Sequence, residues 1–288
     1  MSAPATTPRL LRKIKDERFD VERLSAYGLY LHFGATWFRF CVIDTTDGRC
    51  LWLEHHVLDG PGPDALEHIF DQHQVLKAGY WHHVRAATAD GAFTLVPPEY
   101  FDPERPEVYL RSLLTLREGG SVHHHRGDAD FVTVFEMERR LHEWLTGIYP
   151  MQAVEHRHVV TSWLAGVRRD LDEGSHRTAY LLVESDHFTT LVYRAGQLEF
   201  CNAYGFGSET DFLYFVMLVV SETGFDPEQD ALRVWGEVTP DANVYRKLRK
   251  YVRNVSLGPR PAGLTFFHGF DEVSDHRYYD LFALHYAP

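Results

Sequence analysis

Short apolar stretches with strand-like alternation open the chain, and a helical spacing follows them. The three strand-like stretches cover residues 29–34, 37–44 and 49–58. The gaps between them are short enough for tight turns, which join antiparallel neighbours. Apolar side chains then recur every three or four positions over residues 63–76, as in an amphipathic helix. This part of the sequence therefore predicts a three-stranded meander followed by a helix.

The same order of elements occurs a second time. Strand-like stretches at 178–184, 187–194 and 197–204 come before a helical stretch at 208–223. In both halves a strand, a helix and a last strand follow, so that each half has the order β-β-β-α-β-α-β. The repeat predicts three parts, which are an N-terminal tail at 1–23, a first domain at 24–174 with an insertion at 90–135, and a second domain at 175–288.

This repeated order also predicts the fold class. Three antiparallel strands that lead into two right-handed βα crossovers give a mixed five-stranded sheet with helices on its faces. That arrangement is the ribonuclease-H-like topology, and two copies in tandem are typical of the actin-like superfamily. We therefore expect an α/β protein of two tandem ribonuclease-H-like (actin-like ATPase) domains with mixed five-stranded sheets.

Composition narrows the classes of function. Hydrophobic residues make up 44% of the 288, as in a globular protein with a substantial core. Because 41 Asp and Glu exceed 29 Lys and Arg, the formal charge is -12, which argues against a protein that holds nucleic acid by its phosphates. No apolar run reaches the roughly 18 residues of a membrane span. The three cysteines form no CxxC pair, so we expect free thiols and a cytoplasmic location.

The second half of the sequence resembles known proteins. Residues 180–193, 196–200 and 204–207 are similar to the start of the second domain in PilM-like pilus-assembly proteins and FtsA-like division proteins. Over about residues 26–286 the chain resembles an uncharacterised bacterial family with an actin-like ATPase fold, in which a Pro-rich middle and an ending like that at 280–284 recur. The resemblance implies a nucleotide site, and a PilM-like mode implies a partner peptide near the insertion of the first domain.

The first nucleotide motif that the resemblance implies is incomplete. Each actin-like domain opens with an Asp-x-Gly hairpin, whose glycine lets backbone amides approach a phosphate and whose aspartate positions Mg²⁺ through water. The first hairpin keeps the glycine as Gly34, followed by Thr36, but His32 stands in the place of the aspartate. Gly34 and Thr36 are therefore candidate nucleotide-binding residues without the acid that the chemistry needs.

The other two motifs are also altered. The second hairpin keeps a carboxylate at Glu184, but Asp186 replaces its glycine, and an aspartate beside a triphosphate brings like charges together. The Gly-Gly pair expected near the adenine is Gly236-Glu237. Glu184 and Gly236 complete the set of candidate nucleotide-binding residues, and no catalytic residue is identified. ATP and Mg²⁺ are expected as ligands only if these altered motifs still bind a nucleotide.

Two further features have both a structural and a functional interpretation. His123, His124 and His125 stand in a Gly/Ser/Asp-rich stretch that predicts a loop, where adjacent side chains diverge and no second ligand group is spaced for a metal. We therefore expect no metal site. Nine consecutive apolar residues at 212–220 predict a helix that is buried on all sides or covered by a partner. The candidate interface residues on it are Phe212, Phe215, Val216 and Val219.

Three functions compete at this point. The altered motifs favour a non-catalytic actin-like scaffold that binds a protein partner. The residues that remain leave open a nucleotide-binding actin-like ATPase or phosphotransferase. The apolar helix leaves open a self-assembling structural protein, so the expected partner is either an unknown protein or a second copy of the chain.

Overall fold

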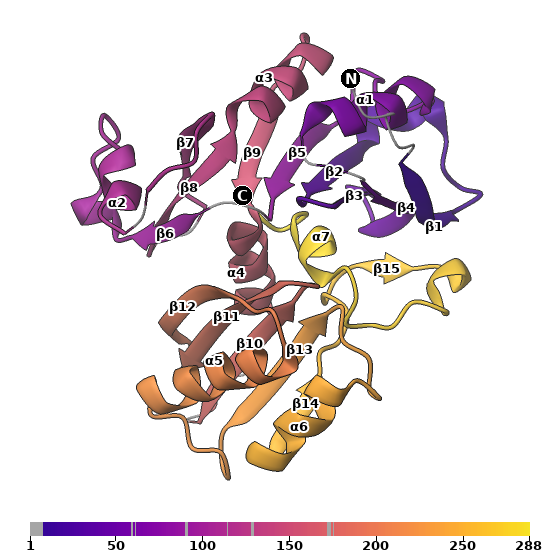
Figure 1. Ribbon diagram of the computed structural model, residues 1–288. Helices are drawn as coiled ribbons and strands as arrows, with labels where there is room; N and C mark the ends of the chain where they lie inside the picture. The colour runs from indigo at the N-terminus through magenta and orange to yellow at the C-terminus, as the bar shows by residue number, and fades with distance from the viewer. Residues whose placement is uncertain are drawn as a thin grey trace, which may run out of the picture. The chain divides into compact units, whose positions relative to one another are not determined.

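The computed structural model describes residues 8–288 apart from 59, 61, 90, 91, 114, 128, 129, 172, 173 and 175. It divides into two compact units (Figure 1). The first comprises Met1–Ala165, Gly263–Glu272 and Leu281–Pro288, and the second comprises Gly166–Ala262 and Val273–Asp280. The predicted boundary at 174/175 lies where residues 172, 173 and 175 are outside the described part.

The first unit contains the predicted meander at the centre of a larger sheet. Its strands are β1 (Arg9–Lys15), β2 (Tyr27–Phe33), β3 (Trp37–Asp44), β4 (Arg49–Val57), β5 (His83–Thr88), β9 (Val154–His158) and β15 (Thr265–Phe266). The order is β1-β4-β3-β2-β5-β9, with β15 beside β4. Strands β2, β3 and β4 pair in antiparallel fashion. Strand β5 runs parallel to β2, and β9 runs parallel to β5. Five of these strands have the order of the ribonuclease-H-like topology.

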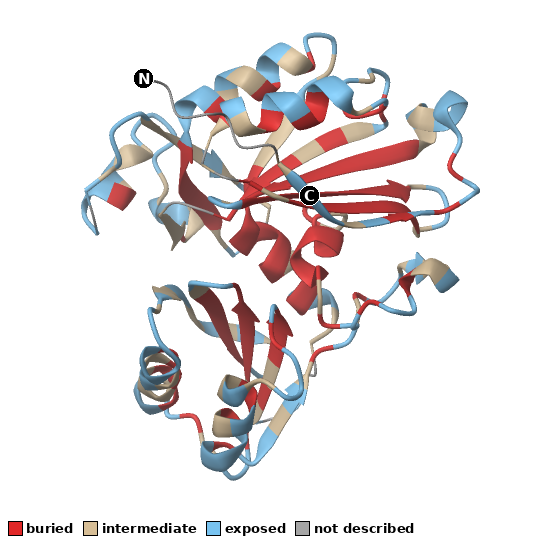
Figure 2. Ribbon diagram, turned by 45° about the vertical axis from the view of Figure 1, so that its right-hand side comes forward, coloured by how far each residue is buried: buried red, intermediate tan, exposed pale blue. Residues whose placement is uncertain are grey.

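Helices cover the sheet of the first unit because their apolar stripes face it. They are the short helix η1 (Val21–Ala26), α1 (Pro63–Gln72) and α3 (Arg139–Ile148), whereas α4 (Val159–Arg169) runs from the first unit into the second. Proline opens α1, where its missing N–H leaves no bond unmade. Helices α1 and α3 lie on one face of the sheet, and their buried side chains join its central core (Figure 2).

The predicted insertion forms a small sheet with its own apolar cluster. The strands β6 (Phe93–Val96), β7 (Gly120–His125) and β8 (Val132–Glu138) pair in the order β6-β8-β7, and the helices η2 (Pro98–Tyr100) and α2 (Glu107–Arg111) precede β7. Val96, Leu110, Val132 and Val134 pack together in its core. The loop predicted around the three histidines is wrong, because residues 120–125 pair with β8 over their whole length.

The second unit repeats the topology of the first. Its strands are β10 (Arg177–Val183), β11 (His187–Arg194), β12 (Gln197–Gly205), β13 (Ala231–Gly236) and β14 (Asn254–Leu257), in the order β12-β11-β10-β13-β14. Helices α5 (Glu209–Glu222) and α6 (Asn243–Tyr251) pack against this sheet (Figure 1). Ser208 caps α5 by accepting a hydrogen bond from the Asp211 amide at 3.2 Å. The predicted α/β class with two ribonuclease-H-like domains is confirmed.

The first unit departs from the expected five strands at both ends of the sequence. Residues 9–15, which the sequence places in an N-terminal tail, form the edge strand β1. Most of its side chains are exposed, so its sequence lacks the alternation of apolar and polar residues that predicts a strand. Charged and exposed side chains are common on strands at sheet edges. Residues 263–272 and 281–288 also join the first unit, where Phe266 packs on Phe282 with ring centroids 5.0 Å apart.

Candidate functional site

Packing inside the first hairpin accounts for its glycine. The hairpin joins β2 to β3, and the Gly34 N–H donates to the Trp37 carbonyl at 3.0 Å. A Cβ on Gly34 would lie 2.3 Å from the Trp37 ring, so the indole needs a glycine at this position. The His32 ring meets the Trp37 ring edge-on, with centroids 4.8 Å apart. The Arg39 guanidinium lies over the face of the Trp37 ring, 3.8 Å from the ring centroid. Trp37 therefore occupies the side of Gly34 that a Cβ would take.

The second hairpin places a carboxylate at its turn. The Glu184 N–H donates to the His187 carbonyl at 2.9 Å, and the Glu184 side chain is buried. Asp186 lies at the tip, where 76% of its side chain is exposed and its carboxylate is 2.8 Å from His187 Nδ1. The Asp186 carbonyl also accepts the Phe206 N–H at 2.8 Å. Asp186 therefore places an exposed negative charge at the tip of the second hairpin.

The third motif is held by the backbone of the second unit. Gly236 has a φ of +96°, and a Cβ there would lie 2.0 Å from the Val183 carbonyl oxygen. Its N–H donates to the His276 carbonyl at 2.9 Å, and the Glu237 N–H donates to the Val183 carbonyl at 2.7 Å. Both amides are thus bonded within the unit, and the glycine is required by the close approach of β13 and β10.

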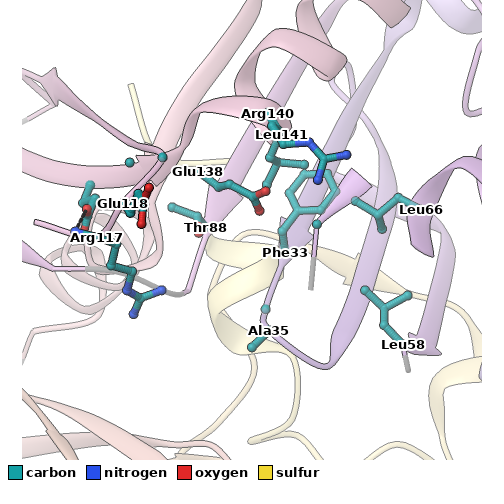
Figure 3. A pocket seen from close by; sticks show the side chains of 15 residues that line it. Phe33, Ala35, Leu58, Leu66, Thr88, Arg117, Glu118, Glu138, Arg140 and Leu141 are labelled. Atoms are coloured by element: carbon teal, nitrogen blue, oxygen red, sulfur yellow. Dashed lines mark hydrogen bonds between the residues drawn. The ribbon is translucent and has the colours of Figure 1, made fainter. Parts of the chain in front are cut away.

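A pocket of about 340 Å³ opens in the first unit beside the first hairpin (Figure 3). Its apolar lining comes from Phe33, Ala35, Leu58, Leu66 and Leu141. Its charged lining comes from Arg117, Glu118, Glu136, Glu138 and Arg140. These side chains belong to the end of β2 and the turn after it, the residue after β4, α1, the turn before β7, the end of β8 and the start of α3. The pocket therefore lies between the core of the first unit and its insertion.

The charged side chains around the pocket differ in how they are fixed. Glu136 is buried and accepts the Arg117 amide at 2.6 Å, so it holds the turn before β7 in place. Arg140 forms an exposed ion pair with Asp64 at 2.9 Å. Exposed pairs of this kind contribute little stability, so Arg140 can exchange Asp64 for another anion at small cost. Arg140, at the exposed rim of the pocket, can therefore adapt to a ligand, whereas the buried Glu136 is held in place.

The predicted site residues are divided between the two units. Of the four nucleotide candidates, Gly34 lines the pocket, and Thr36 is exposed next to it with its carbonyl accepting the Leu58 amide at 2.8 Å. Glu184 and Gly236 belong to the second unit. The rest of the pocket carries no sequence signal, because its residues come from β2, β5, β7, β8, α1, α3 and the segments beside them, which only the fold brings together.

The predicted interface helix is mostly used inside its own unit. Phe212, Val216 and Val219 are buried in the core of the second unit. Phe215 is half-buried and stacks on Tyr204 with ring centroids 5.1 Å apart. Tyr214, which is 62% exposed, is the large side chain that α5 presents to solvent. Of the four interface candidates, Phe215 alone therefore reaches the surface.

Comparison with solved structures finds the same fold. A Bacteroides thetaiotaomicron protein with an actin-like ATPase fold and unknown function aligns with a TM-score of 0.80 and 18% identity, over 93% of this chain and 98% of that chain. A chain of the PilM-PilN type IV pilus biogenesis complex aligns with a TM-score of 0.57 and 10% identity, over 90% and 97% of the two chains. Identities this low show the fold alone, and the predicted actin-like ATPase fold is confirmed.

The sequence comparisons place the chain in a family. No protein with a curated description matches it. Within the described residues, no helix is long and apolar enough to cross a membrane. A family model described as a protein of unknown function, DUF3822, matches residues 16–255, and the chain belongs to this family.

Proposed function

We propose that the protein is a non-catalytic actin-like scaffold that binds a segment of a partner protein. The observation that carries this proposal is the chemistry of the second hairpin, where the exposed Asp186 carboxylate stands at the position for which the resemblance implies a phosphate-binding glycine. Two unit charges 4 Å apart repel by about 1 kcal/mol in water and about 4 kcal/mol at a typical protein surface. Because Asp186 is 76% exposed, the lower figure applies to each nearby phosphate charge.

The other two motifs also disfavour the binding of a phosphate, for reasons of packing and hydrogen bonding. Trp37 packs against Gly34, so an indole lies where the first hairpin would offer its glycine to a phosphate. The amides of Gly236 and Glu237 are already bonded to backbone carbonyls. A nucleotide would therefore meet a negative charge at one hairpin and bonded amides at the third motif, and we expect its binding to be too weak to support catalysis.

The pocket of the first unit supports the binding of a protein segment. A volume of about 340 Å³ is at the lower end of ligand pockets, and it can take one or two side chains of a bound segment. The apolar floor suits an apolar side chain, and the charged rim suits the polar groups that flank it. In type IV pilus biogenesis, a chain of similar fold belongs to the PilM-PilN complex, which supports assembly with another protein as a use of this fold.

Calorimetry with MgATP tests the first half of the proposal. We expect no binding heat from the purified protein with ATP and Mg²⁺ at millimolar concentration, because the like charge at Asp186 and the bonded amides oppose phosphate binding. Glu184→Ala should give the same trace as the unchanged protein. Micromolar binding that Glu184→Ala abolishes would establish the nucleotide-binding alternative and overturn the scaffold.

Selection of peptides tests the second half. Peptides selected from a random displayed library should bind the protein, and Ala35→Trp should weaken them by at least about tenfold, because an indole at the exposed Ala35 fills the mouth of the pocket. Thr36→Trp is the matched control, since Thr36 is exposed at the same turn and does not line the pocket. Equal losses in the two variants, or none in Ala35→Trp, would place the binding elsewhere.

A further inference from the structure

The free edge of the sheet in the second unit is not protected against pairing with a further strand. β12 has nine residues and ends the strand order β12-β11-β10-β13-β14, and no described strand pairs with its other side (Figure 1). Proteins usually protect such an edge with charged side chains, proline or a bulge. Residues 200–204 contain no charge and no proline, and the register irregularity of β12 lies before Phe200. This part of the edge is therefore open to another strand.

The edge strand of the first unit has the opposite character. β1 carries four Lys and Arg side chains within seven residues, so a second copy of β1 beside it would bring like charges together. β12 carries a single charged side chain, Glu199, whose carboxylate is paired with Arg177 at 2.6 Å. Of these two edges, β12 is therefore the one that can pair with a copy of itself.

Aromatic side chains continue from β12 onto the neighbouring helix α5. The Tyr204 ring of β12 stacks on Phe215 with centroids 5.1 Å apart, and Tyr214 meets Phe215 edge-on at 5.3 Å. Tyr204 and Phe215 are half-buried, whereas Tyr214 is 62% exposed. These three rings form an aromatic row that begins at the free edge of the sheet and ends in solvent.

The solvent side of α5 is uncharged as well. A helix at a protein surface usually carries charged and polar residues on the side turned away from the core. Residues 212–221 of α5 include no charged residue. The side chains of this stretch that are half-buried or exposed include Leu213, Tyr214, Met217 and Leu218. Apolar side chains gathered in this way are typical of a surface that another protein covers.

The two features together identify what covers this surface. A single added strand would pair with β12 but would leave Tyr214 in solvent, so the occupant must supply both a strand and an apolar helix. A second copy related by a twofold axis supplies β12 as the strand and α5 as the helix, because such an interface presents the same surface from both sides. Antiparallel pairing of the two edges puts both α5 helices on the same face of the joined sheet.

We propose that the second unit binds a second copy of the chain through the free edge of β12, with the two aromatic rows packed together. The two five-stranded sheets then become one continuous sheet. The interface belongs to the second unit and the pocket to the first, so self-association and the binding of a partner segment can fail independently.

The register with Asn202 on the twofold axis suits this pairing best. It places Phe200 opposite Tyr204 of the second copy, and aromatic pairs across antiparallel strands are favourable. It also places Ala203 opposite Cys201 of the second copy. The Ala203 N–H donates to the side chain of its own neighbour Asn202 at 2.9 Å, and in the dimer a backbone carbonyl of the second copy takes over that bond. No like charges face each other in this register.

Sedimentation velocity of the full chain over a range of concentrations tests the proposal. We expect a monomer–dimer equilibrium with a micromolar or tighter Kd and no larger species, because twofold pairing uses up the free edge. A protein that stays monomeric up to about 100 µM would overturn the proposal without the use of any variant.

Two substitutions locate the interface. Asn202→Lys places like charges opposite each other on the axis, and Tyr214→Lys places a charge in the aromatic row, so each should weaken dimerisation by at least about tenfold. Both side chains are exposed, so circular dichroism should show an unchanged fold. Tyr251→Lys is the matched control, since Tyr251 is 53% exposed on α6, which bonds to β14 at the other edge of the sheet. The proposal fails if the control weakens dimerisation equally, or if neither of the first two does.

A cross-link tests the register. Asn202→Cys should give a disulfide-linked dimer on mild oxidation, because residues directly opposite in antiparallel strands have Cα atoms within the range that a disulfide spans. Gln197→Cys is its control, since Gln197 lies at the far end of β12 from the axis. Both are measured against the unchanged protein, which already contains Cys201. Equal cross-linking of the two variants, or none with Asn202→Cys, would contradict the antiparallel pairing.

Discussion

Gly236→Ala should destabilise the second unit by about 3–5 kcal/mol. The new Cβ would lie 2.0 Å from the Val183 carbonyl oxygen, and that oxygen also accepts the Glu237 amide at 2.7 Å. The atom that the new Cβ meets belongs to the backbone, so no flexible side chain can move to relieve the contact. A φ of +96° adds conformational strain for any residue with a Cβ. Strand β13 would have to separate from β10, and this pair is central to the sheet.

Gly224→Ala is the matched control for this prediction. Gly224 follows α5 with a φ of +62°, but a Cβ there meets nothing within 4 Å. The backbone strain alone should cost about 1–2 kcal/mol. Urea unfolding of the full chain, followed by hydrogen exchange to locate the loss in the second unit, gives the comparison. Equal losses in the two variants would mean that the contact with Val183 is not the cause.

The expected loss of stability also bears on the role of Gly236. The sequence made Gly236 a nucleotide-binding candidate, because the actin-like fold has a glycine pair in this region. The structure gives the glycine a purpose that involves no nucleotide, since it lets β13 approach the Val183 carbonyl. Loss of ligand binding in Gly236→Ala would therefore report damage to the sheet. Only a variant that leaves the fold intact, such as Glu184→Ala with its folding checked, can test the nucleotide site.

The order of elements could be predicted because local patterns determine it. Tight turns fix antiparallel neighbours, and the right-handed crossover fixes where the next strand lies. The edge strand β1 could not be found in this way, because most of its residues face solvent and its alternation is lost. The additional strand β15 is two residues long, and its pairing with β4 depends on contacts that are distant in sequence.

The clusters at the candidate sites could not be predicted for a related reason. Adjacent histidines of β7 do diverge, as the sequence indicates, since His123 turns toward His142 and His124 toward Phe101. His142 and His156, whose rings pack beside His123, come from α3 and β9, and no spacing in the sequence marks these contacts. The residues that line the pocket are likewise brought together only by the fold. Local rules place each element, whereas the grouping of side chains is a result of tertiary packing.

Glu54 should carry the largest single electrostatic contribution in the first unit. It lies on β4 and is 1% exposed. Its carboxylate accepts hydrogen bonds from Trp52 Nε1 at 3.0 Å, and it pairs with Lys13 Nζ at 2.8 Å and with His56 Nε2 at 2.9 Å. Glu54→Leu would leave these donors without their acceptor, so we expect a loss of about 3–5 kcal/mol in the free energy of unfolding.

The pH dependence of stability gives a second test of the same group. Burial alone would raise the pKa of Glu54, but hydrogen bonds from His56, His73 and Lys13 outweigh it and hold the pKa below the usual 4.5. A carboxyl with a lowered pKa in the folded state contributes stability above its unfolded pKa, and this contribution is lost as the pH falls. Stability should therefore decline as the pH falls below about 4.5.

Glu54→Gln separates the charge from the shape. The amide keeps the size of the side chain and one acceptor, so we expect a smaller loss than in Glu54→Leu, of about 2–3 kcal/mol at pH 7. The decline of stability below pH 4.5 should become shallower than in the unchanged protein, because this group no longer takes up a proton on unfolding.

Glu67→Gln is the matched control, since Glu67 is exposed on α1 and its loss removes the same charge. If Glu54→Gln follows the same pH curve as Glu67→Gln, the buried ion cluster does not cause the acid sensitivity, and other carboxylates of the first unit, such as Asp16 beside Arg49, must carry it.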